Sequence, residues 1–357
     1  MAALKMLLDP TKLGTEAQEL EEKLRKRIVG QDAAIREIVD VYQTWLAGMS
    51  SPGRPVANFL FLGPTGSGKT RTVEALAESL AGDARAMIKV DCAEFQHGHE
   101  IAKLIGSPPG YLGHRETHAM LSQEVLNQFH TEKLKLSFVL FDEIEKASDA
   151  LWNLLLGILD KATLTLGDNR RVDFSHAMIF MTGNLGAAEM NAVVQPGLGF
   201  APRAPESSEV SARMARAGVE AARRRFSPEF MNRIDKTVVF NPLGKAELRD
   251  ILKLELDAVQ DRLLATGNVA DLRWSVRTPA REFLLTEGTD ARYGARHLKR
   301  TVERLVVQPL SNLLASGQLH TGDRLVVDFD PGLRRLVFFK EFKETLAAAA
   351  AGTPAAA

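Results

Sequence analysis

The chain has little cysteine, no excess of charge of either sign and no long apolar run. Its one cysteine, Cys92, excludes a disulfide framework and is typical of a reducing compartment. The 45 basic residues balance the 45 acidic ones, so no overall field attracts nucleic acid or a membrane surface. No segment approaches the roughly 18 apolar residues that a bilayer-spanning helix requires, and residues 1–10 lack a signal-peptide pattern. We therefore expect a cytoplasmic protein with neither a membrane nor nucleic acid as its partner.

Strand and helix patterns alternate through the first part of the chain, whose 357 residues are enough for about two domains. Five short apolar runs are typical of buried parallel strands, namely 59–62, 87–90, 138–141, 178–181 and 238–240. Helical patterns separate most of these runs, at 16–28, 33–47, 71–80, 118–135 and 150–161. The alternation predicts an α/β fold in which helices cover a parallel sheet.

The pattern changes after residues 241–244, Asn-Pro-Leu-Gly, where longer helical segments replace the alternation. Helices are predicted at 245–265, 279–287 and 295–315, and a hairpin at 324–329 and 333–339. We therefore place a large α/β domain at 1–243, a smaller and mainly helical domain with a β-hairpin at 244–343, and a disordered alanine-rich tail at 344–357.

A glycine-rich stretch stands between the first apolar run and a helical pattern. It consists of Gly63, Pro64, Thr65, Gly66, Ser67, Gly68, Lys69 and Thr70. The glycines let successive backbone N–H groups face a triphosphate, and the following helix directs its positive end at the same anion. Lys69 would reach the outer phosphates and Thr70 would ligate Mg²⁺. The stretch predicts a site for ATP and Mg²⁺; the alternative is an ordinary glycine-rich turn.

Polar residues also follow two later apolar runs. Asp142 ends the run at 138–141 and could hold the Mg²⁺ shell, while Glu143 could polarise a water for attack on the γ-phosphate. The alternative is a pair of acids that cap the next helix. Asn184, after the run at 178–181, could orient the same water, or could be only a turn residue. The three residues predict hydrolysis as well as binding.

Several further motifs occur in an order typical of one family. The motifs are Ile28-Val29-Gly30-Gln31, 63–70, 106–113, 141–146, 181–184, 226–235 and Tyr293-Gly294-Ala295-Arg296. With them the chain resembles the AAA+ motor module of Clp-type unfoldases. It is most similar to the second ATPase module of ClpB-like and ClpC-like proteins with its small C-terminal domain. The resemblance implies a P-loop AAA+ domain with a three-layer, parallel-sheet architecture, followed by the small domain.

The resemblance also implies roles for residues outside the glycine-rich stretch. Ile28 and Val29 would pack on the adenine edge, and Asn184 matches the first sensor. Arg233 matches the arginine finger, which would reach the nucleotide of a neighbouring subunit, and Arg296 matches the second sensor, which would reach its own. A surface salt bridge is the alternative for either arginine. The use of Arg233 implies a ring, expected to be a homo-hexamer.

Two loops bear on partners. Tyr111 and Leu112 lie in a Pro- and Gly-rich stretch that, in the resembled motors, lines a central pore and grips an extended polypeptide. The alternative is a tyrosine folded onto the core. Leu198–Phe200, Leu-Gly-Phe, fits a tripeptide by which protease-coupled relatives dock on a peptidase ring, although a plain loop would read the same.

These observations predict a ring-forming motor that hydrolyses ATP with Mg²⁺ and pulls proteins through a pore, unfolding or remodelling them. Two alternatives stay open from the residues alone. One is a regulatory ATPase subunit of a Clp-like protease complex. The other is a nucleotide-gated assembly switch or nucleic-acid remodeller, because the same ATPase core serves many ends.

Overall fold

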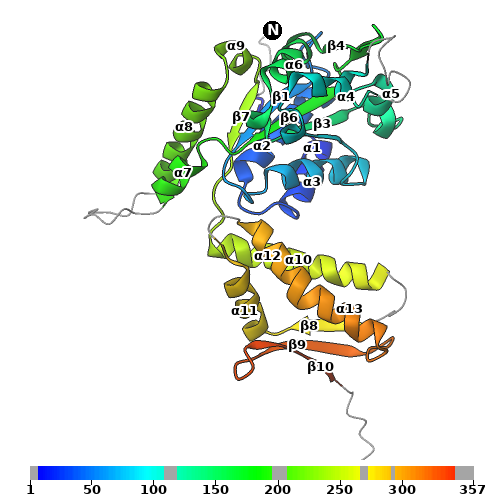
Figure 1. Ribbon diagram of the computed structural model, residues 1–357, viewed down its shortest axis with the longest axis vertical. Coiled ribbons are helices and arrows are strands. Elements are labelled where there is room, and N and C mark those ends of the chain that lie inside the picture. The colour runs from blue at the N-terminus through cyan, green and yellow to red at the C-terminus, as the bar shows by residue number, and fades with distance from the viewer. Residues whose placement is uncertain (1–6, 108–118, 195–206, 266–271, 291–293, 342–357) are drawn as a thin grey trace, which may run out of the picture. The chain divides into compact units, whose positions relative to one another are not determined.

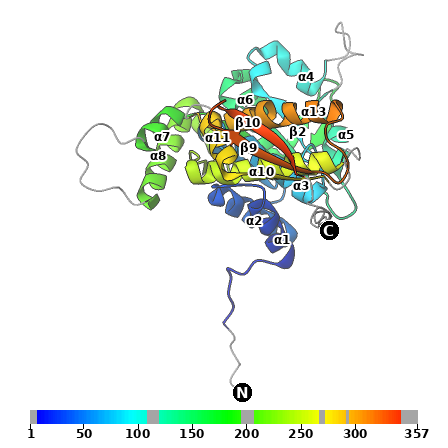
Figure 2. The ribbon, with the colours of Figure 1, turned by 90° about the horizontal axis from the view of Figure 1, so that it is seen from below.

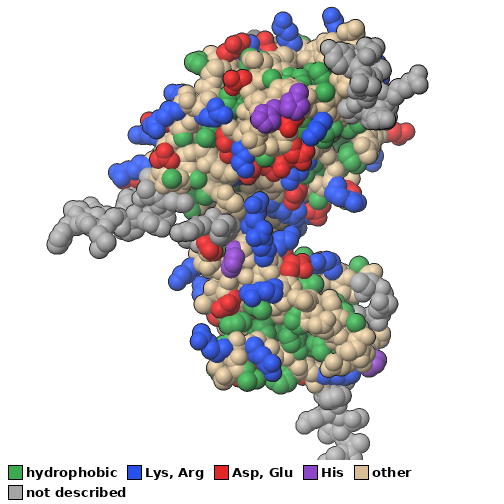
Figure 3. All heavy atoms as spheres, in the orientation of Figure 1, with side chains coloured by type: hydrophobic (Ala, Val, Ile, Leu, Met, Phe, Trp, Pro, Cys, Tyr) green, Lys and Arg blue, Asp and Glu red, His purple; other side chains and the backbone are tan. Residues whose placement is uncertain are grey.

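The computed structural model describes residues 7–107, 119–194, 207–265, 272–290 and 294–341. The chain forms two units, Met1–Leu243 and Gly244–Ala357 (Figure 1). None of the described helices is long and apolar enough to cross a membrane. On the face drawn in Figure 3, each unit carries both Lys or Arg and Asp or Glu side chains.

The first unit is built on a parallel sheet of five strands in the order β2-β3-β6-β1-β7. The strands are β1 (Ala57–Leu62), β2 (Ile88–Asp91), β3 (Ser137–Asp142), β6 (Ala177–Gly183) and β7 (Lys236–Val239). All neighbouring pairs are parallel. The predicted parallel sheet is therefore confirmed, and its strands all present their carboxyl ends at one edge.

The sheet is buried on both faces, which explains its apolar runs. Because successive side chains of a strand point to opposite faces, Leu60 and Leu62 enter one core while Phe59 and Phe61 enter another. The helices α1 (Thr15–Arg25), α2 (Asp32–Leu46) and α3 (Lys69–Ala81) contribute to the second core. With α6 (Asp149–Lys161) in the first core, the unit has three layers.

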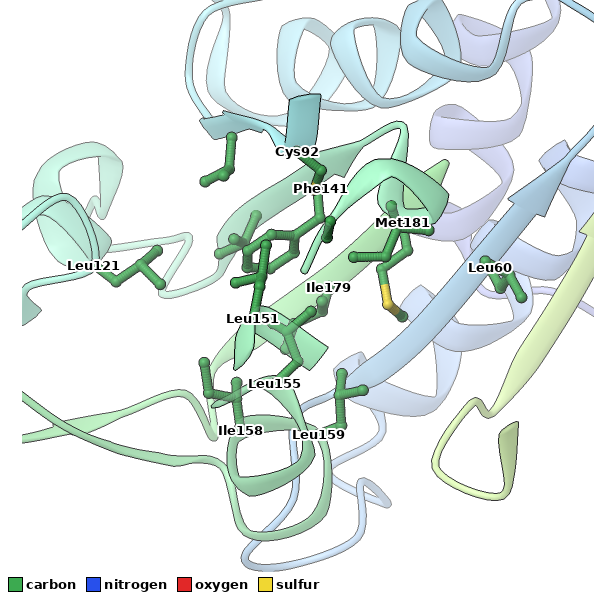
Figure 4. Close-up of a cluster of buried hydrophobic side chains, with 14 of the residues drawn as sticks. Leu60, Cys92, Leu121, Phe141, Leu151, Leu155, Ile158, Leu159, Ile179 and Met181 are labelled. Atoms are coloured by element: carbon green, nitrogen blue, oxygen red, sulfur yellow. The ribbon is translucent and has the colours of Figure 1, made fainter. Parts of the chain in front are cut away.

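Figure 4 shows how α6 covers the first face of the sheet. Leu151, Leu155 and Ile158 follow the i, i+4, i+7 spacing of one helix face and turn toward Phe141 and Ile179. All five side chains are 0% exposed. The helix therefore forms here because its apolar stripe matches the apolar face of two central strands.

Cys92 lies in the same core and is fully buried. Burial, more than the nearby carboxylates, raises the pKa of its thiol well above its ordinary value. The thiol is therefore protonated at neutral pH and behaves as a small core residue.

The helix predicted over 118–135 was wrong. In the described part of this segment, the chain forms only the short helix α5 (Gln123–Leu126) and a single 3-10 turn at Asn127–Phe129. Leu121 and Leu126 enter the first core, whereas Leu134 and Leu136 enter the second. One straight helix cannot deliver side chains to both faces of a sheet, so the segment bends around it.

The rest of the first unit consists of short elements and one helical pair. These elements are α4 (Ala102–Ile105), β4 (Thr163–Thr165), β5 (Arg171–Asp173), α7 (Ala187–Val194), α8 (Ser207–Arg225) and α9 (Pro228–Met231). The sequence pattern did not predict β4 and β5, which form an antiparallel hairpin. Helices α7 and α8 pack on each other, and Figure 2 shows the pair beside the rest of the unit.

The second unit packs helices on a small mixed sheet. Its helices are α10 (Lys245–Ala265), α11 (Thr278–Gly288), α12 (Ala295–Val302) and α13 (Gln308–Ala315). Its sheet has the order β10-β9-β8, from β8 (Arg273–Val276), β9 (Arg324–Asp330) and β10 (Arg335–Glu341). The predicted hairpin is β9 with β10, and β8 adds a parallel strand that the sequence pattern did not reveal.

The predicted single helix at 295–315 is interrupted. A π-helical turn at Glu303–Val307 separates α12 from α13, whose first turn contains Pro309. Proline has no N–H to donate to the preceding turn, so the regular α pattern is locally replaced.

Candidate functional site

Most of the polar residues singled out above lie at the carboxyl edge of the parallel sheet. Strand β6 lies between β1 and β3, and Leu62 at the end of β1 is in register with Gly183 at the end of β6. The loops that follow these three strands are therefore adjacent, although they are far apart in the sequence. Crevices at this edge of open α/β sheets are the usual place for ligands.

The loop after β1 needs its glycines. Gly63 has φ 151°, and a Cβ there would lie 2.7 Å from the backbone oxygen of Phe240. Gly68 has φ 101° and immediately precedes α3, but a Cβ there would meet nothing within 4 Å. The backbone thus approaches Phe240 closely on one side and leaves open space beside the first turn of α3, where N–H groups can face an anion.

Lys69 is the first residue of α3 and is 8% exposed. Its Nζ donates to the carbonyl oxygens of Gly63 (2.8 Å) and Pro64 (3.0 Å) and to Oδ1 of Asn184 (2.9 Å). A largely buried ammonium group beside a glycine loop is well suited to pair with an anion.

Asp142 ends β3 at the centre of a group of oxygen atoms. The hydroxyl of Thr70 lies 3.2 and 3.3 Å from its two carboxylate oxygens, and the hydroxyl of Thr182 donates to Oδ1. Lys89 lies 3.4 Å from Oδ2. Carboxylate and hydroxyl oxygens are the ligands that Mg²⁺ prefers, so Thr70 and Asp142 fit a magnesium site. Thr182 and Lys89 join this group without having been predicted.

Glu143 has an uncommon backbone conformation for a residue with a side chain, with φ 58° and ψ 48°. Its N–H donates to the hydroxyl of Thr182 (3.1 Å), which holds this conformation. It makes no side-chain capping bond to the 3-10 turn Ile144–Lys146 that follows, so a capping role does not explain it. Residues in strained conformations are concentrated at functional sites.

The carboxylate of Glu143 faces two polar partners. Lys146 donates to Oε2, and this bond raises the pKa of the Lys146 ammonium group. The side-chain amide of Asn184 lies 3.5 Å from Oε1. Lys146 was in a motif noted above, but its pairing with Glu143 was not predicted.

Asn184 links the acidic residues to the glycine loop. Its Oδ1 accepts from Lys69, as described, and lies 3.5 Å from the hydroxyl of Thr65. Its backbone N–H donates to Oε1 of Glu145 (2.9 Å). The amide side chain therefore stands between the phosphate-type loop and Glu143, where it could orient a small polar molecule.

Gln31 is a site residue whose role the sequence analysis missed. It is 3% exposed, and its side-chain amide nitrogen donates to the backbone oxygens of Ser67 and Asn241, each at 3.0 Å. Its Oε1 accepts from the N–H of Asn241 (3.1 Å). Gln31 therefore places the segment 28–31 beside the glycine loop; Ile28 is buried in the second core and Val29 is partly exposed.

Arg233 lies at the opposite edge of the sheet. It comes just before β7, and the side chain of Asn58, near the start of β1, donates to its carbonyl oxygen (3.0 Å). Its guanidinium lies 3.2 Å from Glu229 and 3.7 Å from Asp160. Gly63 follows Asn58 by five steps along the strand, which is about 17 Å. The structure therefore does not bring Arg233 to the edge that carries Lys69.

Arg296 belongs to the second unit, near the start of α12, where its side chain is exposed. It lines an open hollow of about 550 Å³. The other lining residues are Lys299, Arg300, Glu303, Arg304 and Gln308. The hollow is mainly basic and could accept an anionic group.

Tyr111, Leu112 and Leu198–Phe200 lie outside the described residues. In the sequence, the segment that contains Tyr111 connects α4 to residues 119–121. Gly167, in the β4–β5 hairpin, donates its N–H to the oxygen of Ile105 (2.8 Å), and Leu121 donates to the oxygen of Leu104 (3.1 Å). Leu121, which follows this segment, is therefore held against α4, and α4 itself is held by the β4–β5 hairpin.

Comparison with known proteins gives consistent matches to both units. The family described as the AAA domain (Cdc48 subfamily) matches residues 54–237, and the C-terminal D2-small domain of ClpB protein matches residues 243–327. The chain is 40% identical over 319 residues to the chaperone protein ClpB of Bdellovibrio bacteriovorus, covering 88% of this chain and 34% of that protein.

Two other relatives are informative. The ATP-dependent Clp protease ATP-binding subunit ClpC of Staphylococcus saprophyticus is 38% identical over 311 residues, which are 87% of this chain and 36% of that protein. A cryo-electron microscopy reconstruction of the closed state of Hsp104 with ATPγS and FITC casein has a TM-score of 0.73 at 29% identity. That match covers 91% of this chain and 52% of the Hsp104 chain. The chain thus spans only part of the length of these relatives.

Proposed function

Because the chain belongs to the AAA family and carries the D2-small domain of ClpB-type proteins, we propose that it is an ATP-hydrolysing ring motor that unfolds or remodels proteins by threading them through a central pore. The observation that carries the proposal is the meeting of Lys69, Thr70, Asp142 and Asn184 at one edge of the sheet. A cradle, a cation, metal ligands and a polar amide are the parts that phosphoryl transfer to water requires.

The residues of the glycine loop would bind the nucleotide. Backbone N–H groups of Thr65, Gly66 and Gly68 would contact the phosphates, whereas the N–H of Gly63 donates to the oxygen of Gly183 (3.2 Å) and shapes the loop. Lys69 would bind the outer phosphates. Ile28 and Val29 would line the adenine side, with Gln31 fixing their distance from Ser67. Thr70 and Asp142 would hold Mg²⁺, which supplies charge neutralisation at the β- and γ-phosphates when it is bound.

Glu143 would act as the general base. A water placed between Glu143 and Asn184 would lose its proton to the Glu143 carboxylate as its oxygen attacks the γ-phosphate. The left-handed backbone at Glu143, held by Thr182, and the bond from Lys146 both orient this carboxylate. Asn184 would hold the water in line through its side-chain amide, while Glu145 fixes the Asn184 backbone.

Arg233 would complete the site of a neighbouring protomer. Its place at the amino edge of the sheet, a strand length away from its own glycine loop, supports action in trans. Such an arrangement closes into a ring when every protomer lends the same residue, and we propose a homo-hexamer. Arg296 would contact the nucleotide of its own protomer and couple hydrolysis to rotation of the second unit.

Protein is the proposed substrate, gripped by Tyr111 and Leu112. An aromatic ring next to an aliphatic side chain can hold any sequence, which suits a motor that must not be selective. The solved Hsp104 relative contains casein, which supports this choice. The bonds to α4 from Leu121 and from Gly167 of the β4–β5 hairpin would transmit movements of the first unit to the grip.

An ATPase assay with an unfolded protein, with DNA and with neither tests the proposal. We expect the unfolded protein to stimulate turnover and DNA to have no effect. Stimulation by DNA alone would instead support a nucleic-acid remodeller. A purified chain that stays monomeric with ATP at every concentration, yet hydrolyses it at full rate, would contradict the ring.

Replacement of Tyr111 tests the grip separately from the chemistry. Tyr111→Ala should lower the unfolding rate of a tagged reporter about tenfold or more, because a central aromatic contact is lost. Basal ATPase should stay within about twofold, since Tyr111 is not among the residues proposed to bind or hydrolyse the nucleotide. Tyr111→Phe is the matched control and should keep most of the unfolding activity. If the Tyr111→Ala chain unfolds the tagged reporter at the wild-type rate, the proposed role of Tyr111 in the pore is contradicted.

A second function is favoured by one observation, the 38% identity to a Clp protease ATP-binding subunit. In that case Leu198–Phe200 would dock on a peptidase ring. Capture of a peptidase that depends on these three residues would support it.

A cytoplasmic location, expected from the single cysteine, stays a prediction.

A further inference from the structure

Trp152, on α6, contacts the acidic loop of the site. Its indole Nε1 donates to the carbonyl oxygen of Ile144 at 3.0 Å. Ile144 directly follows Glu143, the proposed general base, so this bond acts one peptide away from the reacting carboxylate. A leucine or phenylalanine could fill the same space in the core, but neither could donate to this carbonyl.

The other side of Trp152 contacts the segment that carries Arg233. The ring of Phe226 meets Trp152 edge-on, with centroids 5.4 Å apart, and Phe226 stacks on Phe230 at 5.1 Å. The carbonyl of Phe230 accepts from the N–H of Arg233 (3.1 Å). Three aromatic rings in preferred geometries therefore connect α6 to the backbone of Arg233.

Arg225 joins these two contacts. Its guanidinium lies 4.2 Å from the centroid of the Trp152 ring, and its Nη2 donates to the carbonyl oxygen of Glu145 (2.9 Å). Glu145 in turn accepts the backbone N–H of Asn184 through its carboxylate. Trp152 and Arg225 thus donate to the carbonyls of two consecutive residues of the acidic loop, Ile144 and Glu145.

We infer that Trp152 is a positioning residue that makes the acidic loop 143–145 and the segment 225–233 move as one body. The inference rests on the proposed function, because Arg233 would serve the next protomer. A shift of Glu143 and Asn184 during hydrolysis would then displace Arg233 through Ile144, Trp152, Phe226 and Phe230. The nucleotide bound at one site would in this way set the position of the Arg233 guanidinium that enters the neighbouring site.

Mixed rings test this link, because a protomer without its own general base can affect turnover only through its neighbours. Wild-type chain would be mixed in equal amounts with Glu143→Gln or with Glu143→Gln/Trp152→Leu. With random mixing, about half of the wild-type sites have a substituted protomer as the neighbour that supplies Arg233. If misplacement slows each of those sites about tenfold, ATPase should fall about twofold below the Glu143→Gln mixture.

Two further mixtures are the reference and the control. Glu143→Gln/Arg233→Ala gives the full loss of the finger and should fall at least as far. Glu143→Gln/Trp274→Phe also loses an indole hydrogen bond, from Trp274 to Gln260 (3.1 Å) in the second unit, and should match Glu143→Gln alone. If the Arg233 mixture matches Glu143→Gln alone, the trans finger and hence the proposed function fail. If the Arg233 mixture falls but the Trp152 mixture matches Glu143→Gln alone, the inference fails and the proposed function stands.

Folding and assembly must be separated from positioning. Each variant should keep the unfolding temperature, the ring size and the affinity for a fluorescent ADP analogue of the Glu143→Gln chain. A Trp152→Leu chain that loses ring assembly or nucleotide affinity in parallel with its effect on ATPase would show a structural role and overturn the inference. If Trp152→Leu does not fold, Arg225→Gln removes the cation above the ring and leaves the core filled, and the same twofold fall is expected of it.

Discussion

The two edges of the parallel sheet are organised differently. At the carboxyl edge, Lys69 donates to Asn184 and Thr70 lies against Asp142, and Glu143 and Thr182 connect the two pairs by hydrogen bonds. At the amino edge, the guanidinium of Arg233 donates to the carbonyl oxygen of Glu229 (2.9 Å) and lies 3.2 and 3.7 Å from the carboxylates of Glu229 and Asp160. The carboxyl edge thus joins the loops of three strands, whereas the amino edge holds one partly exposed arginine by a carbonyl and two acids.

The physical cause of this difference is the parallel sheet itself. Parallel strands gather their carboxyl ends at one edge and keep their amino ends a full strand length away. A residue that precedes β7, such as Arg233, cannot reach the loop that follows β1. Partly exposed ion pairs are also weak, so Arg233 can exchange the carboxylates of Glu229 and Asp160 for a phosphate. Three substitutions, taken from the largest expected effect to the smallest, test this contrast.

Arg233→Ala should lower the ATPase kcat about a thousandfold if the amino edge completes a neighbouring site, because an arginine finger contributes at least that much. Steady-state kinetics on the assembled chain measure the effect. Arg54→Ala is the matched control, since Arg54 pairs at the same edge with Asp235 at 3.3 Å. It should change kcat less than about twofold. A wild-type kcat for Arg233→Ala would show that the carboxyl edge of a protomer's own sheet is enough for hydrolysis.

Glu143→Gln should lower kcat about a hundredfold or more, because the amide keeps the shape but cannot take a proton. Nucleotide binding at the carboxyl edge should persist, as measured with a fluorescent ATP analogue. The exposed neighbour Glu94 offers the control Glu94→Gln, which should leave kcat within about twofold. Phosphate release at the wild-type rate from Glu143→Gln would refute its role.

Asn58→Ala should mainly affect the stability of the amino edge. Asn58 is 0% exposed and donates to the carbonyls of Leu159 and Arg233, each at 3.0 Å. Removing both donors should cost about 2 kcal/mol of unfolding free energy, with a smaller loss of kcat than Arg233→Ala. Urea denaturation measures it against Asn127→Ala, an exposed asparagine expected to cost less than about 0.5 kcal/mol. Equal costs would contradict the buried role of Asn58.

The elements that could be predicted are those with strong local patterns. Helix α10, Lys245–Ala265, has the predicted bounds, and the five strands of the parallel sheet lie at or next to the predicted runs. Segment 119–135 could not be predicted, because its leucines divide between two cores that only the folded sheet creates. The short strands β4, β5 and β8 were missed for a similar reason: each has three or four residues and depends on a partner strand.

The sequence by itself determined the glycine loop, the acidic pair and the succession of strands and helices along the chain. Backbone freedom, charge and periodicity, on which these depend, are local properties. Only the tertiary structure decided which groups share an edge. Strand order placed Thr182 between Asp142 and Glu143, joined Gln31 to Ser67 and put Trp152 between the acidic loop and Phe226. These contacts join residues far apart in the chain, and their geometry follows from the packing of both faces of one sheet.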